Sequence, residues 1–237
     1  MKRWPRGQGL SAAALKGVAI CSMLLDHALK TLWWDAPTVL YVLGRLAFPL
    51  YAFLLVQGAK HTHHMGKYAL RLAVFALLSE VPFDLCLYEQ PFYWFSQNVF
   101  WTLLLGLLAI WAYEQSDRRG ALWLGVVAMI AALRLGDVLN TDYGSRGVGC
   151  ILFMYFAGKS SHKGLQLTLC GLGIAWTGAF SLLFAGSMLQ MCALLALIPI
   201  GLYNGQKGRQ GPKILWYGFY PLHLLILWLL QMGQLWR

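Results

Sequence analysis

Long apolar segments run through this chain almost from end to end, separated by short polar loops. A helix that crosses a bilayer needs about 20 mostly apolar residues, because each residue advances it only slightly through a thick hydrocarbon layer. Hydrophobic residues make up 59% of the 237 positions and charged residues only 12%, too few to form the polar shell of a water-soluble domain. The sequence therefore predicts an all-α protein, a polytopic transmembrane helix bundle that forms a single domain over residues 1–237.

Apolar windows and the residues that interrupt helices predict nine spans. They cover residues 12–33, 38–58, 67–87, 97–114, 120–139, 146–159, 164–181, 187–203 and 213–236. The sixth span is short, and a tilted or partial crossing there would change the number of spans by one. Lys16 interrupts the first apolar stretch and no small-residue cleavage site follows it, so we expect a retained first helix rather than a signal peptide.

Lysine and arginine are unevenly divided between the loops, and positive loops favour the cytoplasm. One side holds most of them: Lys2, Arg3, Arg6, Lys60, Lys67, Arg118, Arg119, Lys159, Lys163, Lys207, Arg209 and Lys213. The opposite loops hold Asp35, Glu89 and Asp142. We therefore expect a cytoplasmic amino terminus. The net charge of +10 follows from these loops, and without a nucleic-acid-binding module no nucleic-acid partner is predicted.

The residues that commonly bind metals do not form a convincing site. The five cysteines are scattered singly through apolar stretches, which argues against a disulfide framework or a zinc site. His61, His63 and His64 lie close together, but no acidic or cysteine ligand accompanies them. A solvated loop is the better interpretation, and no metal is predicted.

Two adjacent ionisable residues, Asp26 and His27, lie inside the first span. An ionisable group at membrane depth is costly unless it is paired, so each is a candidate functional residue whose partner has to be found. Neighbours on a helix do not face each other, and Asp26 and His27 therefore need different partners. Arg45 in the second span should reach a similar depth and is the expected counter-ion of Asp26. A purely structural ion pair is the alternative.

The third span places Glu80 and Asp84 on one face, with Pro82 between them. Two carboxylates so close would repel unless one is protonated or a cation intervenes. Capping and packing near the interface is an equally good interpretation of this pair. Arg134 and Asp137 in the fifth span have the spacing of a local ion pair.

The remaining polar groups fall into two zones. The outer zone adds Asn98, Asp142, Tyr143, Arg146 and His223, the last of which has helix packing as its alternative role. The inner zone forms a cationic patch of Lys16, His61, His63, His64, Lys67 and Arg71. Such a patch suits phosphate groups.

Short motifs in both halves of the chain form a distinctive set. They are Leu-Leu-Asp-His at 24–27, Gly-Arg-Leu-Ala-Phe-Pro-Leu-Tyr-Ala-Phe at 44–53, Gly58 with His61-Thr62 and residues 67–72, Val-Pro-Phe at 81–83, Asn-Val-Phe at 98–100, residues 141–148, and Phe-Tyr-Pro-Leu-His at 219–223. Together they resemble the TraX family, membrane proteins named for acetylation of the amino terminus of a conjugative pilin. The match extends from about residue 10 to the last helix. Gln57 departs from it, since the family more often has glutamate there.

The resemblance implies an acetyl-coenzyme A-dependent acetyltransferase of the bacterial cytoplasmic (inner) membrane, in contact with membrane lipids. The coenzyme's phosphates would bind side chains of the inner zone: Lys67, Arg71, His61 and His63. His27 would act as general base on an amine or hydroxyl, or carry the acetyl group itself. Asp26 completes the candidate catalytic group, in which Arg45 or Asn98 stabilises the oxyanion.

The acceptor would meet the enzyme in the outer half of the membrane. Six residues are candidates for binding it: Glu80, Asp84, Asp142, Tyr143, Arg146 and His223. A protein amino terminus such as that of a pilin, an amino sugar and a lipid all remain possible acceptors.

Two other classes of protein also fit the buried charges. In a proton-coupled transporter, Asp26, His27, Glu80 and Asp84 would form a proton relay, but the missing inverted repeats and small size disfavour it. In a noncatalytic membrane assembly factor the charges would only specify packing. Binding of acetyl-coenzyme A to the purified protein separates the acetyltransferase from both.

Overall fold

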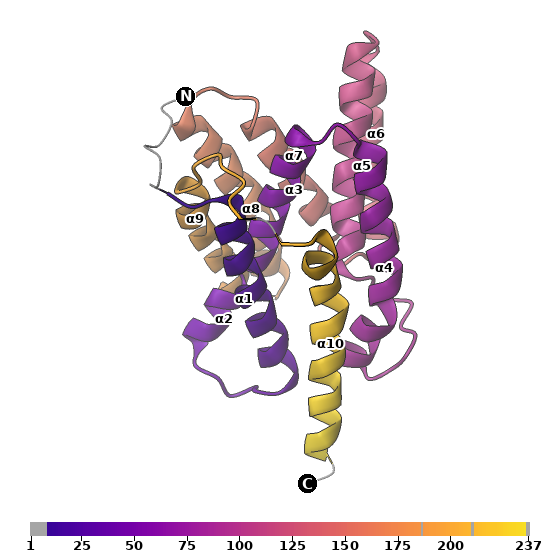
Figure 1. The fold of residues 1–237 in the computed structure, drawn as a ribbon, viewed down its shortest axis with the longest axis vertical. Helices are drawn as coiled ribbons and strands as arrows, with labels where there is room; N and C mark the ends of the chain where they lie inside the picture. Colours follow the sequence, from indigo (N-terminus) through magenta and orange to yellow (C-terminus); the bar gives the residue numbers. More distant parts are fainter. Residues whose placement is uncertain (1–8, 186, 210, 236–237) are drawn as a thin grey trace.

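The computed structural model describes residues 9–185, 187–209 and 211–235, and in these ranges the chain is a bundle of helices without strands (Figure 1). The elements are α1 (Ala12–Thr31), α2 (Thr38–Gly44), α3 (Ala47–His61), α4 (Met65–Tyr88), α5 (Val99–Arg118), α6 (Leu122–Val138), α7 (Gly144–Ala157), α8 (Lys163–Ala185), the 3-10 helix η1 (Leu189–Ala196), α9 (Leu197–Gly201) and α10 (Lys213–Leu235). The predicted all-α class is confirmed.

Each of the nine predicted spans corresponds to a helical segment of the described residues, with α2 and α3 sharing the second and η1 and α9 the eighth. Four segments are long and apolar enough to cross a membrane unaided: Ala12–Thr31, Thr38–His61, Val99–Arg118 and Lys213–Gly233. The 14 residues of α7 cover about 21 Å at about 1.5 Å per residue, less than a hydrocarbon core. The protein is an integral membrane helix bundle, whereas nine complete crossings stay a prediction.

Two of the predicted spans are not continuous α-helices. The second breaks at Arg45 and Leu46, between α2 and α3. Pro49 has no N–H for the carbonyl of Arg45, so the regular hydrogen-bond ladder cannot continue through this turn. The eighth begins as a 3-10 helix and becomes α-helical only over Leu197–Gly201.

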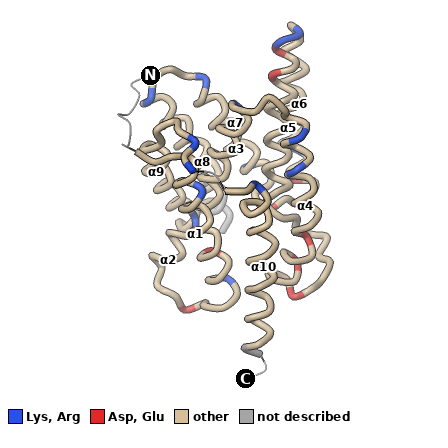
Figure 2. Tube along the Cα trace, in the orientation of Figure 1, with Lys and Arg blue, Asp and Glu red and all other residues tan. Residues whose placement is uncertain are grey.

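Hydrogen bonds between loops join the segments at both ends of the bundle. At the inner end, which holds the predicted cytoplasmic loops, the Leu10 N–H donates to the Leu202 carbonyl (2.8 Å) and Asn204 N–H to the Leu10 carbonyl (3.0 Å). At the outer end, Gln97 N–H donates to Asn140 (2.9 Å) and Asp142 N–H to Gln97 (2.8 Å). Most of the blue segments in Figure 2 lie in its upper half, towards the inner end.

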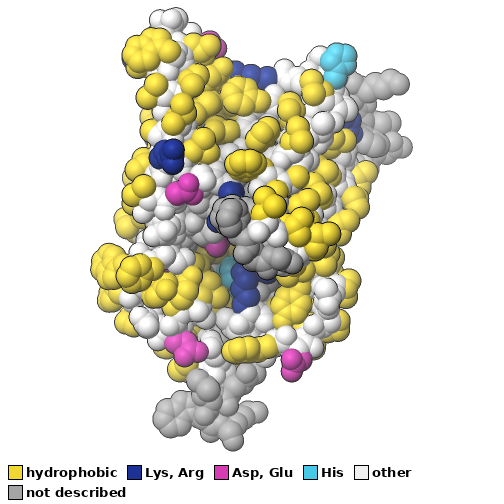
Figure 3. All heavy atoms as spheres, turned by 180° about the vertical axis from the view of Figure 1, so that it is seen from behind, with side chains coloured by type: hydrophobic (Ala, Val, Ile, Leu, Met, Phe, Trp, Pro, Cys, Tyr) yellow, Lys and Arg dark blue, Asp and Glu magenta, His cyan; other side chains and the backbone are white. Residues whose placement is uncertain are grey.

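Apolar side chains cover much of the outside of the bundle, as the face in Figure 3 shows. They include residues on α4 and α6 such as Leu70, Leu77, Val127 and Ile130, each more than half exposed. In water such a surface would be a strong liability for aggregation, whereas lipid chains solvate it. The surface therefore agrees with the membrane environment that the composition predicts.

Candidate active site

The imidazoles of His27 on α1 and His223 on α10 face each other in the core, where each is less than a tenth exposed. His27 Nδ1 lies 2.8 Å from His223 Nε2, and His223 Nδ1 lies 2.8 Å from the carbonyl oxygen of Phe219. A carbonyl only accepts, so the hydrogen of His223 must be on Nδ1. In neutral His223, Nε2 is then an acceptor, and His27 donates to it from Nδ1. Neutral His27 consequently keeps its lone pair on Nε2, which is what a general base requires.

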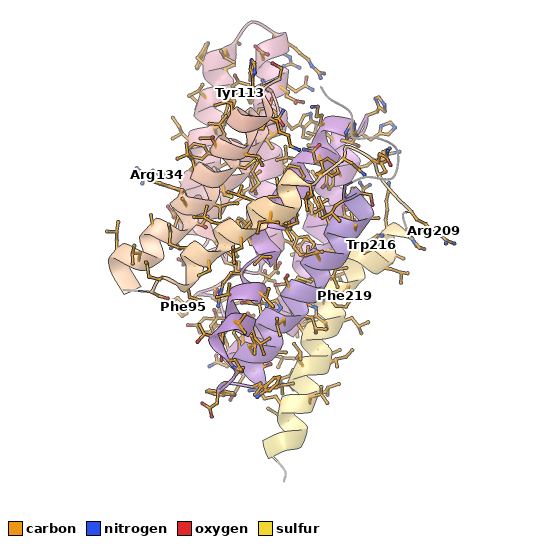
Figure 4. The ribbon with its side chains drawn as sticks, turned by 90° about the vertical axis from the view of Figure 1, so that its left-hand side faces the viewer. Phe95, Tyr113, Arg134, Arg209, Trp216 and Phe219 are labelled. Carbon is orange, nitrogen blue, oxygen red and sulfur yellow. The ribbon has the colours of Figure 1, made fainter. Side chains whose placement is uncertain are left out.

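Aromatic rings and one hydroxyl hold this histidine pair in place. Phe219 stacks on His223 with ring centroids 5.0 Å apart, and the Tyr220 ring meets both imidazoles edge-on at 6.0 Å and 5.6 Å. Thr31 donates its hydroxyl hydrogen to the His27 carbonyl at 2.9 Å. Phe219 and Trp216 are labelled on α10 in Figure 4. The pair therefore sits in a packed setting that restricts the rotation of both rings.

Asp26 faces away from the histidine pair and contacts two cations. Its Oδ2 lies 2.6 Å from Lys30 Nζ, and its Oδ1 lies 3.3 Å from Arg45 Nη2. The predicted Asp26–Arg45 pair is thus present in the structure. Lys30 was not among the predicted partners of Asp26, although its position four residues later on the same helix was a usable signal.

Gly44 explains why a glycine precedes the arginine in this motif. A Cβ atom added to Gly44 would lie 3.0 Å from Asp26 Cβ and 3.1 Å from Asp26 Cα. Backbone atoms cannot move aside as a flexible side chain can, so any larger residue would push α2 away from α1. The absence of a side chain at Gly44 lets Arg45 reach Asp26.

A cavity of about 420 Å³ extends into the bundle from the inner end, between α1, α3, α4, α5 and α10. Basic side chains line it at that end: Lys16, His61, Arg71, Lys207 and Lys213. Its deeper walls are largely apolar, with Met23 and Leu103 among them, and Tyr220 lines it beside the histidine pair.

The predicted coenzyme-binding residues divide into two groups. His61 and Arg71 line this inner cavity, and Arg71 lies over the Tyr68 ring, 5.4 Å from its centroid. His63 and Lys67 are exposed and do not line it. Lys207 and Lys213 also line this cavity, although in the sequence they indicate only the orientation of the chain. No local pattern reveals that the loop before α10 folds over the start of α1, where Ala13 N–H donates to the Lys207 carbonyl.

A second, smaller cavity of about 170 Å³ lies at the outer end. It is lined by Lys30, Arg45, Asp142, Tyr143, Arg146, Thr177 and Gln190. Three of the predicted acceptor-binding residues, Asp142, Tyr143 and Arg146, thus lie together with Arg45. In Figure 3 basic side chains and a histidine are visible side by side below the centre of a face that is largely hydrophobic.

Glu80 and Asn98 belong to neither cavity. Asn98 caps α5, because its Oδ1 accepts from Phe100 N–H (3.0 Å), while its amide donates to the Ala76 carbonyl (2.8 Å) and Glu80 (2.7 Å). With both amide hydrogens donated, Asn98 has none left for an oxyanion, and the structure corrects that prediction to a capping role. Glu80 also accepts from Trp101 Nε1 (2.5 Å), which fixes the start of α5.

The other predicted carboxylates are likewise bound to backbone groups. Asp84 accepts from Tyr93 N–H (2.8 Å) outside both cavities, and Asp137 accepts from Ser145 N–H (2.8 Å). Arg134 points away from the bundle in Figure 4, and no ion pair with Asp137 occurs among the described residues. In those residues no group of three or more His, Cys, Asp or Glu side chains could hold a metal ion.

A protein-family model and a curated relative each match most of this chain. A family model described as "TraX protein" matches residues 11–231. The chain is also 29% identical, over 245 residues, to a Dichelobacter nodosus protein named "Probable fimbrial assembly protein FimC, serogroup H1". That alignment covers 94% of this chain and 96% of the relative. No solved structure matches the chain.

Proposed function

This chain belongs to the TraX family, and from that premise we propose that it is an acetyltransferase of the bacterial cytoplasmic membrane. It moves an acetyl group from cytoplasmic acetyl-coenzyme A to an amine or hydroxyl in the outer half of the membrane. The observation that carries the proposal is the inner cavity, which leads from five basic side chains to Tyr220, whose ring lies edge-on against both imidazoles of the His27–His223 pair. The family is associated with pilin acetylation and the relative's name refers to fimbrial assembly, so a pilin amino terminus is the favoured acceptor.

The donor site follows from the lining of the inner cavity. Lys16, Arg71, Lys207 and Lys213 supply positive charge where the phosphates of the coenzyme would enter. The largely apolar walls beyond them suit the pantetheine arm, whose thioester then reaches Tyr220. A cavity of about 420 Å³ is within the usual range for small-molecule sites.

The chemistry uses the free nitrogen of His27. Its Nε2 takes the proton of the acceptor amine or hydroxyl while that group attacks the thioester carbonyl. The carbon–sulfur bond then breaks, and the proton on His27 passes to the departing coenzyme thiolate. During the step His27 is a cation, and its Nδ1–H bond to His223 becomes charge-assisted and stronger.

The tetrahedral oxyanion needs a hydrogen-bond donor close to the histidine pair. We assign this role to the buried Tyr220 hydroxyl, with Arg45 as the other candidate, because the Asn98 amide is already used for capping. His223 is a positioning residue in this scheme. An acetyl-histidine intermediate on His27 Nε2 would use the same geometry.

Purified protein in lipid nanodiscs tests the proposal. Calorimetry should detect binding of acetyl-coenzyme A, and radiolabelled acetyl should pass to a peptide with a free amino terminus. His27→Gln should keep the binding and lose the transfer. A noncatalytic assembly factor or a proton-coupled transporter would bind no acetyl-coenzyme A, and that result would refute the acetyltransferase.

A further inference from the structure

The outer cavity carries charges of both signs in a small volume. Lys30, Arg45 and Arg146 contribute three positive charges, and Asp142 contributes a negative one. Asp26 already contacts Lys30 and Arg45 from the side of α1. A lining of cations beside a separate carboxylate is complementary to a ligand that itself carries both an acid and an amine.

Two hydrogen-bond donors of this cavity are not used within the described residues. The Nε of Arg45 and the Nε2 of Gln190 are buried and make no hydrogen bond there. An unpaired buried donor destabilises the fold unless an acceptor reaches it, so both indicate a place for an oxygen-bearing ligand group. A guanidinium and an amide together suit the two oxygens of a carboxylate.

The size of the cavity limits what can enter it. Its volume of about 170 Å³ is below the usual range for a complete small-molecule ligand. It therefore fits one residue or one head group of a larger acceptor, with the rest of that molecule lying outside. The side chains around it are polar, which disfavours an acyl chain as the occupant.

The cavity also lies close to the proposed reaction centre. Lys30 and Arg45 line the outer cavity, and both contact Asp26, the residue next to His27 on α1. The inner cavity reaches Tyr220, whose ring contacts the imidazole of His27. A group held by Arg45 would thus be a near neighbour of the acetyl group delivered from the cytoplasm.

We propose that the outer cavity selects a peptide acceptor with a free amino terminus and an acidic side chain among its first few residues. Arg45, Arg146 and Gln190 bind the acid, while Asp142 attracts the ammonium group. That group releases one proton to solvent before the neutral amine attacks and gives a second proton to His27. This inference rests on the proposed function and names its substrate class. A lipid phosphate is the other oxyanion that the cations could hold, but the carboxylate of Asp142 favours an acceptor that brings an amine.

Two synthetic peptides that differ only in glutamate or glutamine near a free amino terminus test the selection. Their affinities are measured directly by calorimetry, without acetyl transfer, on protein in nanodiscs of phosphatidylcholine. The glutamate peptide should bind about tenfold more tightly, the change of about 1.4 kcal/mol that one charge-assisted contact provides. Arg146→Gln should make the two peptides equal. Arg134→Gln, an exposed cation outside both cavities, is the matched control and should keep the difference.

Each outcome bears on one proposal. Equal affinities for the two peptides, or no affinity for either, overturn the acidic-peptide selection. Loss of the glutamate preference when anionic phosphatidylglycerol replaces zwitterionic phosphatidylcholine assigns the cavity to an anionic lipid head group instead and also overturns it. If the preference persists but acetyl-coenzyme A does not bind, the outer site stands and only the acetyltransferase fails. A thermal melt of each variant separates loss of contact from loss of folding.

Discussion

His27 on the first helix donates a hydrogen bond to His223 on the last, with 2.8 Å between Nδ1 of one ring and Nε2 of the other. The two residues are 196 positions apart in the chain. The Phe219 carbonyl accepts from His223 Nδ1 and so fixes the tautomer of His223. When both rings are neutral, only one placement of the ring hydrogens fits the two hydrogen bonds, and it leaves Nε2 of His27 without a hydrogen. Packing of the last helix against the first thereby determines the tautomer of His27, the candidate base.

The two histidines should therefore differ in their contributions to turnover. His27→Gln should lower acetyl transfer by about 100-fold or more, as loss of a general base typically does. His223→Gln should lower the rate of acetyl transfer less than His27→Gln does, since the glutamine side-chain oxygen can still accept from His27 Nδ1. His223→Leu provides no acceptor and should lower the rate more than His223→Gln does. Steady-state transfer at saturating acetyl-coenzyme A measures all three. Equal losses in His223→Gln and His223→Leu would show that the hydrogen bond does not matter.

Asp26→Asn should reduce stability as well as activity. The substitution leaves Lys30 and Arg45 next to each other without their carboxylate, and breaking a buried ion pair by removing one partner costs about 3–5 kcal/mol. Asp26 is slightly exposed, so we expect the lower end of that range. Thermal unfolding in detergent measures the change, with the exposed loop variant Asp35→Asn as control. Similar melting temperatures for both variants would mean that the ion pair is not structurally important.

Gly44→Ala should separate α2 from α1. The new Cβ would press on Asp26 Cα and Cβ, and overpacking of this kind costs about 1–3 kcal/mol. Gly17→Ala on α1 is the matched control, because a Cβ there meets no atom within 4 Å. Alanine favours helix more than glycine does, so Gly17→Ala should be neutral or stabilising. The difference in melting temperature between the two variants is the measurement, and no difference would argue against the close contact.

Local pattern was enough to predict the helical segments and the Asp26–Arg45 pair. Long apolar runs predict the helices. The distance of a residue from the nearest loop gives its depth in the membrane, so two opposite charges at the same depth can be predicted to pair. The capping role of Asn98 could also have been predicted from the sequence, since an asparagine directly before an apolar run is a typical helix cap.

Other features depend on packing that no local pattern contains. The His27–His223 contact joins the first and last helices, and the basic lining of the inner cavity combines α1, α4 and the loop before α10. Lys67 and Arg71 lie one turn apart and looked equivalent, yet only Arg71 reaches the cavity. Tertiary arrangement decides each of these cases.

The orientation of the bundle can be tested by labelling single cysteines introduced into loops. Residues 62 and 117 should be reached only from the cytoplasm, and residues 90 and 142 only from outside, because the basic loops lie on one side. Impermeant maleimide applied to intact cells and to inverted vesicles gives the comparison. Residues 62 and 142 on the same side would remove the separate entry routes for donor and acceptor.

Arg71 and Lys67 provide the sharpest test of the donor site, since both are basic and only four residues apart on α4. Arg71 lines the inner cavity beside Tyr68, whereas Lys67 is exposed outside it. Arg71→Gln should weaken acetyl-coenzyme A binding about tenfold, which corresponds to losing about 1.4 kcal/mol of charge-assisted contact. Lys67→Gln should change the affinity little. Repeating the titration with S-acetyl pantetheine, which lacks the coenzyme's nucleotide phosphates, should abolish the effect of Arg71→Gln if the guanidinium binds those phosphates. An effect of equal size with both donors would place Arg71 in a structural role, and equal losses in Arg71→Gln and Lys67→Gln would mean that only the general positive charge of the inner end attracts the coenzyme.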